Sequence, residues 1–168
     1  MDLEAEYNNR ARVPDHMQAM AQWKATAEAA RADHPPEVLA YGPGEREVLD
    51  LFSAGPDAPI VVFLHGGYWQ ALDKDWFSGL APALLHHGVS LAVPSSDLAP
   101  AVRLGTILKQ VRAAVDLIRE RNGGQRPVVF GHSAGGHMSA CMLSEARASA
   151  AVAISGVFDL RPLIHTSL

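Results

Sequence analysis

Residues 128–136, Val-Val-Phe-Gly-His-Ser-Ala-Gly-Gly, decide the fold of this chain. The first three form a short apolar run typical of a buried strand, and a helix can follow from about residue 134 to residue 145. Between them stands a Gly-x-Ser-x-Gly pattern, in which a strained strand-to-helix turn lifts a serine hydroxyl above the edge of a sheet. Such a pattern also occurs by chance in glycine-rich loops, but here strand, turn and helix stand in the order that the chemistry needs. We predict that Ser133 is a catalytic nucleophile and that the N–H of Ala134 faces the position of an oxyanion.

A second glycine turn lies earlier in the chain. The apolar run Ile60–Leu64 is followed by His-Gly-Gly-Tyr-Trp at residues 65–69. Gly66 and Gly67 can offer backbone N–H groups without a side chain that would block an acyl group, so we predict that they complete an oxyanion hole with Ala134. A purely structural glycine turn is the alternative. A phosphate-binding loop is excluded, because neither of its glycine patterns is present.

The other elements alternate along the chain. We expect two antiparallel strands at 37–41 and 46–52, joined by Gly-Pro-Gly, and then strands at 60–64, 89–94, 128–130 and 151–154. Helices are predicted at 75–87, where Gly88 ends the helix, at about 107–121, and at 134–145. Strands that alternate with single helices imply parallel crossovers. The sequence therefore predicts an α/β fold, with a mostly parallel sheet covered by helices on both faces and an antiparallel start.

An N-terminal helical segment, residues 1–36, precedes the sheet within a single domain of residues 1–168. Its helix is predicted to begin at Asp15, which can cap it while Gln18 reaches back, and to stop before the proline pair at 35–36. An apolar stripe at helical spacing is expected to face inward. It consists of Met17, Met20, Trp23, Ala27 and Ala30.

Composition narrows the possible partners. The chain is 48% apolar and 19% charged, which is typical of one globular domain with a substantial core. Its 18 acidic residues outnumber 14 scattered basic ones, so neither a nucleic acid nor an anionic membrane is an expected partner. We expect a small-molecule substrate, an acyl amide or ester.

The cysteines, the apolar runs and the histidines exclude further classes of protein and of site. The single cysteine, Cys141, cannot form a disulfide within the chain and is expected to be buried. No apolar run reaches membrane-spanning length and no secretory leader pattern stands at the start, so we expect a cytoplasmic protein. The eight histidines include no metal-binding spacing, so we expect no metal site.

With both glycine turns placed, the chain resembles the kynurenine formamidases (arylformamidases), in the esterase/lipase branch of the α/β-hydrolases. The segments that carry this resemblance are Tyr7–Arg10, His65–Gln70, Asp97–Pro100, Gly131–His137 and Ser155–Leu160. The resemblance implies hydrolysis of N-formyl-L-kynurenine to kynurenine and formate, a step of tryptophan breakdown, without a metal or organic cofactor. It also implies that Ser133 attacks the formyl carbon.

Three side chains next to these glycines are candidates for contact with the substrate. Tyr68 and Trp69 can line an aryl pocket, or they can pack in the core against a neighbouring helix. His132, beside the nucleophile, is the third candidate.

The partners of the nucleophile are harder to place. In this architecture the acid and the base follow the serine in chain order, which leaves Glu145, Asp159, His137 and His165. His137 lies about one helical turn after Ser133 and is badly placed for a base. Asp159 and His165 form a candidate triad with Ser133, but the resemblance implies that acid and base come later.

We therefore expect the chain to be truncated, with the final strands of the fold missing. A sheet that lacks them leaves an apolar edge, which predicts aggregation or pairing with another chain, for example as a homodimer. Two further functions remain open. One is a carboxylesterase that acts on small acyl esters, and the other is a non-catalytic hydrolase-fold protein that only binds a ligand or a partner.

Overall fold

The computed structural model describes residues 2–8 and 12–167, so Asn9 and Arg10 of the Tyr7–Arg10 match, and Leu168, lie outside the described part. Six strands of the described residues form one sheet in the order β1-β2-β4-β3-β5-β6. The pairs β1–β2 and β2–β4 are antiparallel, whereas β4–β3, β3–β5 and β5–β6 are parallel. The predicted fold class is thereby confirmed. The strands are β1 (Glu37–Ala40), β2 (Val48–Phe52), β3 (Ile60–Leu64), β4 (Ser90–Pro94), β5 (Val128–His132) and β6 (Ala150–Ile154).

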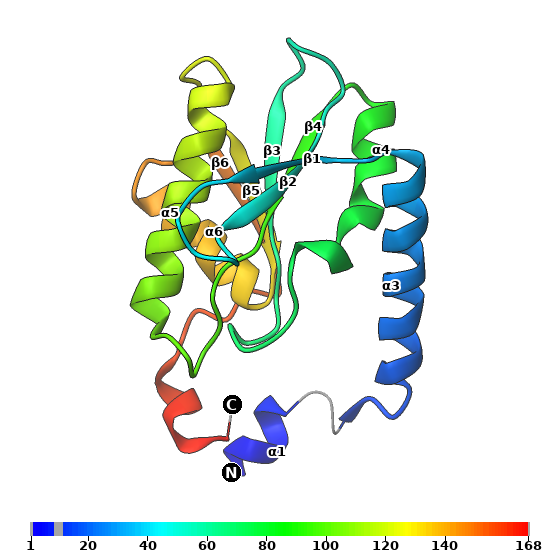
Figure 1. Cartoon of the computed structure of the whole chain (residues 1–168). Coiled ribbons are helices and arrows are strands. Elements are labelled where there is room, and N and C mark those ends of the chain that lie inside the picture. The colour runs from blue at the N-terminus through cyan, green and yellow to red at the C-terminus, as the bar shows by residue number, and fades with distance from the viewer. Residues whose placement is uncertain (1, 9–11, 168) are drawn as a thin grey trace.

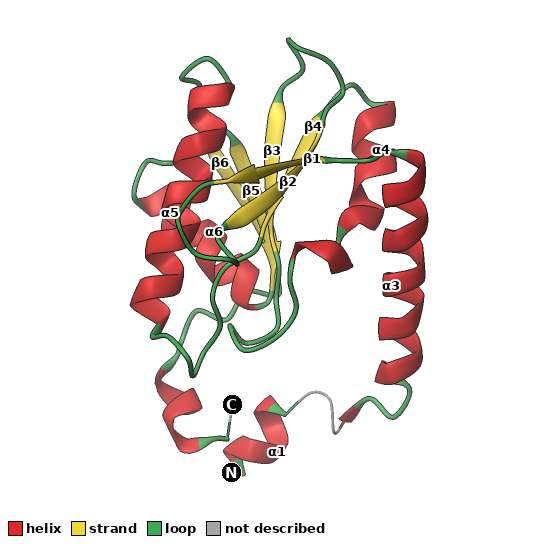
Figure 2. Cartoon of the chain, viewed as in Figure 1, coloured by secondary structure: helices red, strands yellow, loops and turns green. Residues whose placement is uncertain are grey.

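Helices lie on both faces of this sheet (Figures 1 and 2). On one side are α5 (Leu104–Arg121) and α6 (Ala134–Ser144), and on the other are α3 (His16–Asp33) and α4 (Ala81–His86). The described chain also has a short helix α1 (Leu3–Tyr7), which the sequence analysis did not predict, and the 3₁₀ turns η1 (Lys74–Trp76), η2 (Ser78–Leu80) and η3 (Arg161–His165). No helix in the described ranges is long and apolar enough to cross a membrane.

Two apolar cores hold the layers together. The larger core joins the α5–α6 side to the sheet, and Ile107, Val115 and Ile118 of α5 are almost completely buried in it. The smaller core lies under α4 and includes Phe52 and Phe63. Because β3 contributes to both cores, its uninterrupted apolar sequence is explained by burial on both faces.

The predicted helix at 75–87 is wrong in its first half. The chain forms η1 and η2 there, and α4 begins only at Ala81, with Pro82 in its first turn. The Asp73 side chain accepts the N–H of Asp75, and the Ser95 hydroxyl accepts the N–H of Lys74 at 3.1 Å. These side-chain contacts hold the backbone in short turns, which helical spacing of leucines does not reveal. Gly88 does end α4, at φ +71° as predicted.

The predicted N-terminal helix exists, but two details of it are wrong. Asp15 makes no side-chain capping bond, and the N–H of Gln18 donates instead to the main-chain oxygen of Asp15 at 3.0 Å. The apolar stripe is buried only at Ala27 and Ala30, whereas Met17 is 67% and Trp23 49% exposed. Only the C-terminal half of α3 therefore packs on the body of the protein. Cys141 is half-buried against the larger core rather than enclosed by it.

The edge strand β6 is largely exposed. Val152 and Ile154 are about half exposed, and the following loop exposes Phe158 at 61%. Within the described residues β6 pairs only with β5. An uncovered apolar edge of this kind was expected, and self-association through it stays a prediction that sedimentation can test.

Candidate active site

The turn that carries Ser133 joins β5 to α6. Ser133 has φ +56° and ψ −118°, a sparsely populated positive-φ conformation that costs a residue with a side chain about 1–3 kcal/mol. Main-chain bonds hold it there: the N–H of Ser133 donates to Ile154 O at 2.9 Å, and Ser133 O accepts the N–H of Val157 at 3.4 Å. The strained strand-to-helix turn expected from the Gly-x-Ser-x-Gly pattern is present.

At the two glycines of the Gly-x-Ser-x-Gly pattern, the neighbouring backbone leaves no room for a side chain. A methyl group on Gly131 would lie 2.4 Å from Gly135 O, and one on Gly135 would lie 1.8 Å from Leu64 O. Each contact is to backbone, which cannot turn away as a flexible side chain can. The end of β3, the end of β5 and the start of α6 therefore meet so closely that only glycine fits.

The glycine loop, residues 65–72, meets this turn directly. A methyl group on Gly66 would lie 2.9 Å from His132 O and 3.3 Å from Ser133 Cβ. Gly67 has φ +107°, and a methyl group there would lie 2.4 Å from Ala71 O. The structure thus brings the two predicted glycine turns into contact, although they are far apart in the sequence.

The two aromatic residues of the glycine loop differ in their surroundings. Trp69 is 8% exposed, belongs to the larger core, and lies edge-on to His137 with ring centroids 5.4 Å apart. Tyr68 is only half-buried, lines a cavity with Ser133, and donates its hydroxyl to Tyr7 O at 2.9 Å. Of the two alternatives left open by the sequence, core packing describes Trp69, whereas Tyr68 is placed to meet a ligand.

The cavity above Ser133 has a volume of about 310 Å³, which is at the small end for sites that bind organic ligands. The floor of the cavity is the glycine loop with the turn at Ser133. Its outer wall is the N-terminal half of α3 with the residues before it. Sequence analysis missed most of these residues, although the exposed stripe on α3 was the available signal. The lining residues are Val13, His16, Ala19, Met20, Trp23, Gly66, Gly67, Tyr68, Leu72, Phe77, His132 and Ser133.

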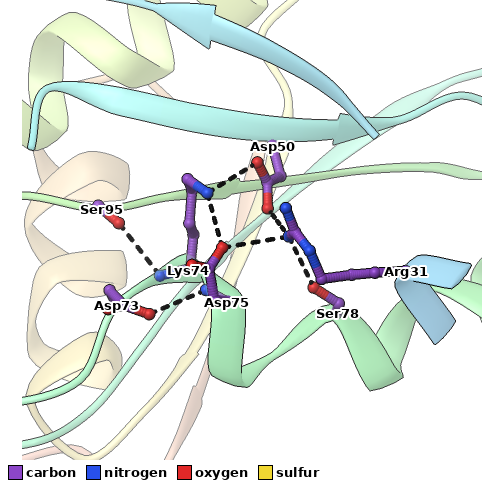
Figure 3. A network of polar contacts seen from close by, with 7 residues as sticks. All are labelled: Arg31, Asp50, Asp73, Lys74, Asp75, Ser78 and Ser95. Carbon is purple, nitrogen blue, oxygen red and sulfur yellow. Dashed lines mark hydrogen bonds and ion pairs between the residues drawn. The ribbon is translucent and has the colours of Figure 1, made fainter. Parts of the chain in front are cut away.

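A buried ionic network holds α3 beside this cavity (Figure 3). Asp50 of β2 is fully buried and pairs with Arg31 of α3 and with Lys74 of η1, the latter at 3.1 Å. Asp75 joins both cations, at 3.2 Å from Arg31 and 2.6 Å from Lys74, and Arg31 also donates to the Ser78 hydroxyl at 3.2 Å. Arg31 and Lys74 thus pair with one buried carboxylate, Asp50, and one that is half exposed, Asp75, and the bonds of Arg31 tie α3 to the sheet.

The histidines near Ser133 lie in different environments. His65 is buried, stacks on Phe77 with ring centroids 5.7 Å apart, and its Nδ1 lies 2.8 Å from Gly66 O. Burial lowers the pKa of His65, and it lowers the pKa of His137 as well. His132 is exposed and lines the cavity. On the cavity's far wall, the Nδ1 of His16 lies 2.8 Å from Val13 O.

The candidate partners Asp159 and His165 are not joined to Ser133 by any hydrogen bond found in the described chain. Both carboxylate oxygens of Asp159 bind Arg161, at 2.8 Å and 2.7 Å, which lowers the pKa of Asp159 to about 2. His165 is exposed at the end of η3. Glu145 pairs with Arg112 at 2.7 Å on the protein surface, and His137 contacts Trp69 and Cys141. These contacts do not support any of the four as the partner of the nucleophile.

The described residues contain no group of three or more His, Cys, Asp or Glu side chains arranged to hold a metal ion. What the site contains is a hydroxyl on a strained turn, adjacent glycine amides and a largely apolar cavity. Such an arrangement can present a nucleophile and hydrogen-bond donors to an acyl group.

Known proteins share this construction. A family model for the alpha/beta hydrolase fold matches residues 61–167. The chain is 35% identical to a kynurenine formamidase of Salmo salar and 34% identical to one of Danio rerio, over 75% of this chain and 47% of each relative. It therefore spans about half the length of these curated relatives.

A protein from Silicibacter sp., provisionally named a thioesterase, has a solved crystal structure. Its sequence is 37% identical to this chain, and the two structures superpose with a TM-score of 0.89. That match covers 99% of this chain and 68% of the other. The resemblance to kynurenine formamidases is confirmed by these similarities. Fold, strained serine turn and family match agree, and the chain belongs to the alpha/beta hydrolase fold family.

Proposed function

We propose that this chain carries the nucleophile and the oxyanion site of a serine hydrolase that removes a small acyl group. One observation supports the proposal above all: Ser133 stands on a positive-φ turn, in contact with Gly66, at the wall of the same cavity. A serine that served only the fold would not need a strained backbone beside a second glycine turn.

The proposed reaction proceeds through an acyl-enzyme. The Ser133 hydroxyl attacks the carbonyl carbon, and its proton passes to a base as the tetrahedral intermediate forms. The amides of Gly66, Gly67 and Ala134 hold the negative oxygen. The carbon–nitrogen bond then breaks, and the amine leaves with a proton. Water next attacks the acyl-serine and restores the hydroxyl, so that the acid is released.

The substrate that we propose is N-formyl-L-kynurenine, which would give kynurenine and formate. Similarity to kynurenine formamidases supports this choice. The cavity supports it as well, because Trp23, Tyr68 and Phe77 offer aromatic surface to an aryl group while a formyl group needs little room at Ser133. We propose that the acid and the base lie later in chain order than β6, as the resemblance implies.

An ester or thioester substrate is the second candidate. The similarity to the Silicibacter protein that is provisionally named a thioesterase supports it. The same nucleophile and oxyanion donors would serve for cleavage of an amide, an ester or a thioester bond. The ratio of kcat/KM for N-formyl-L-kynurenine to kcat/KM for a short-chain aryl ester separates the two. We expect the formyl amide to be preferred.

Hydrolysis of N-formyl-L-kynurenine, with and without the Ser133→Ala substitution, tests the proposal. We expect the release of kynurenine and formate by a protein that includes both this chain and the proposed acid and base, and none by its Ser133→Ala variant, at an unchanged melting temperature. Equal hydrolysis by both proteins would remove Ser133 from the mechanism. Tight binding of the substrate without any turnover or acylation would instead support a protein that only binds a ligand.

A further inference from the structure

The glycine loop contains a conformation that its own sequence does not favour. Tyr68 and Trp69 are consecutive residues with φ +50° and +58°, and Leu72 follows with φ +74°. Bulky side chains rarely adopt this left-handed region even singly, and glycine would adopt it freely. Contacts from elsewhere in the molecule must therefore hold residues 68–72 in place.

Main-chain groups of the loop are anchored by distant segments. Trp69 O accepts the N–H of Ala99 at 2.7 Å, and Leu72 O accepts a bond from the Arg46 guanidinium at 2.9 Å. The N–H groups of Gln70 and Ala71 both donate to Gly67 O, at 2.9 Å and 3.1 Å. These bonds fix the second half of the loop.

The first half, which holds Gly66 and Gly67, has these bonds to Gly67 O and the His65 contact to Gly66 O, and the two aromatic side chains add long-range anchors. The indole of Trp69 is enclosed in the larger core and meets His137, which lies on α6 one turn after Ser133. The hydroxyl of Tyr68 reaches in the other direction, to Tyr7 O of the N-terminal helix α1. One side chain thus ties the glycines to the helix that carries the nucleophile, and the other ties them to α1.

The helix α1 is itself bonded to the last described residues of the chain. Both carboxylate oxygens of Glu4 accept bonds from Ser167, one from the N–H and one from the hydroxyl, each at 2.8 Å. Figure 1 shows α1 beside the last residues of the chain. The bond from Tyr68 therefore ends on a segment that packs beside η3.

We infer that Tyr68 and Trp69 are positioning residues for the oxyanion amides. Their side chains hold a left-handed stretch of backbone so that Gly66 and Gly67 stay against Ser133. The inference rests on the proposed function for its catalytic meaning, but the effect on the loop itself can be measured without catalysis. It also gives the segment around Tyr7, which the resemblance singled out, a physical role in the site.

The variant Tyr68→Phe removes the hydroxyl and keeps the ring. We expect hydrogen exchange of the amides at 66–70 to speed up about fivefold, which corresponds to one ordinary hydrogen bond. The rate of Ser133 phosphonylation by a fluorophosphonate at saturation should fall by a similar factor, while the half-saturating concentration stays the same. A residue that only lined the cavity would change the half-saturating concentration instead.

Tyr41→Phe is the matched control, because the Tyr41 hydroxyl also donates to a main-chain oxygen, that of Ser95. We expect this variant to lower the melting temperature without faster exchange at 66–70. Unchanged exchange at 66–70 in Tyr68→Phe would overturn the inference. If the unmodified chain is not phosphonylated at all, the proposed function fails, and the exchange measurement still decides whether Tyr68 holds the loop.

Discussion

The floor and the outer wall of the cavity are built in different ways. The floor consists of the turns after β3 and β5, where glycines, main-chain bonds and close backbone contacts fix Ser133 against Gly66. The outer wall is the N-terminal half of α3, whose side chains are largely exposed and whose firm attachment lies at its other end, at Arg31. If the proposed function is correct, the chemistry belongs to the closely packed part of the molecule, and the choice of substrate belongs to a more exposed part, which can vary at little cost to stability.

The largest effect is expected in the floor, from Gly135→Ala. The added methyl group would lie 1.8 Å from Leu64 O and 2.8 Å from His65 O, and neither backbone oxygen can move without separating β3 from α6. We expect a loss of more than about 4 kcal/mol of unfolding free energy, measured by urea denaturation. Gly105→Ala in α5 is the control, because nothing lies near its added methyl group and alanine favours a helix by up to about 1 kcal/mol. Equal stability of the two variants would contradict the close packing described for the floor.

The next largest effect concerns the attachment of the wall. Asp50→Asn removes the buried carboxylate and leaves Arg31 and Lys74 paired only with the half-exposed Asp75, so we expect a loss of about 1–3 kcal/mol in denaturation. In Glu37→Gln the lost partner belongs to an exposed pair with Arg121, so the loss should stay below about 1 kcal/mol. Equal losses of unfolding free energy in Asp50→Asn and Glu37→Gln would contradict the conclusion that Asp50 attaches α3 to the sheet.

A pH dependence is expected from the histidine that begins the glycine loop. Burial lowers the pKa of His65 below its ordinary value of 6.5, so the unfolded chain takes up protons more readily than the folded chain. His65 therefore contributes stability that is fully present above pH 6.5 and is lost as the pH falls toward its folded pKa. Denaturation at several pH values should show the unfolding free energy falling as the pH falls. The His65→Gln variant should show a smaller decrease over the same pH range. An identical slope in the variant would show that other groups, such as His137, cause it.

The smallest effect on stability is expected in the wall itself. Trp23 is half exposed, so Trp23→Ala should cost about 1 kcal/mol or less, yet it removes aromatic surface from the cavity. If the proposed function is correct, the KM for an aryl substrate should rise about fivefold, whereas that for a small alkyl ester should change little. Met17→Ala, on the same helix but outside the cavity lining, should change neither. A uniform fall in kcat for both substrates would place Trp23 in the floor rather than in the wall.

The sequence predicted the floor better than the wall, for a physical reason. Glycine and serine patterns report local backbone requirements, so the turns at Ser133 and at Gly66 and their common edge of the sheet followed from short segments. The stripe on α3 has helical spacing, but spacing does not say whether an apolar face meets a core or a cavity. Burial of Trp69 and exposure of Trp23 depend on what the rest of the chain places beside them.

Long-range polar contacts were also beyond the reach of sequence patterns. No residue near Asp50 in the sequence indicates that it will pair with Arg31 and Lys74. Nor does the sequence indicate that bonds from Asp73 and Ser95 hold short turns in the first half of the predicted helix at 75–87. The candidate triad shows the same limit, because the neighbouring Arg161 occupies Asp159. Charged side chains take partners that only the folded arrangement brings near.

The most direct test of the central claim is covalent labelling of the chain with a fluorophosphonate, followed by peptide mass spectrometry. If Ser133 is a nucleophile held against oxyanion donors, one adduct should form on the peptide that contains Ser133, and the Ser133→Ala variant should remain unlabelled. A folded protein that includes the acid and the base and takes up no label, or takes it up equally after Ser133→Ala, would contradict the account.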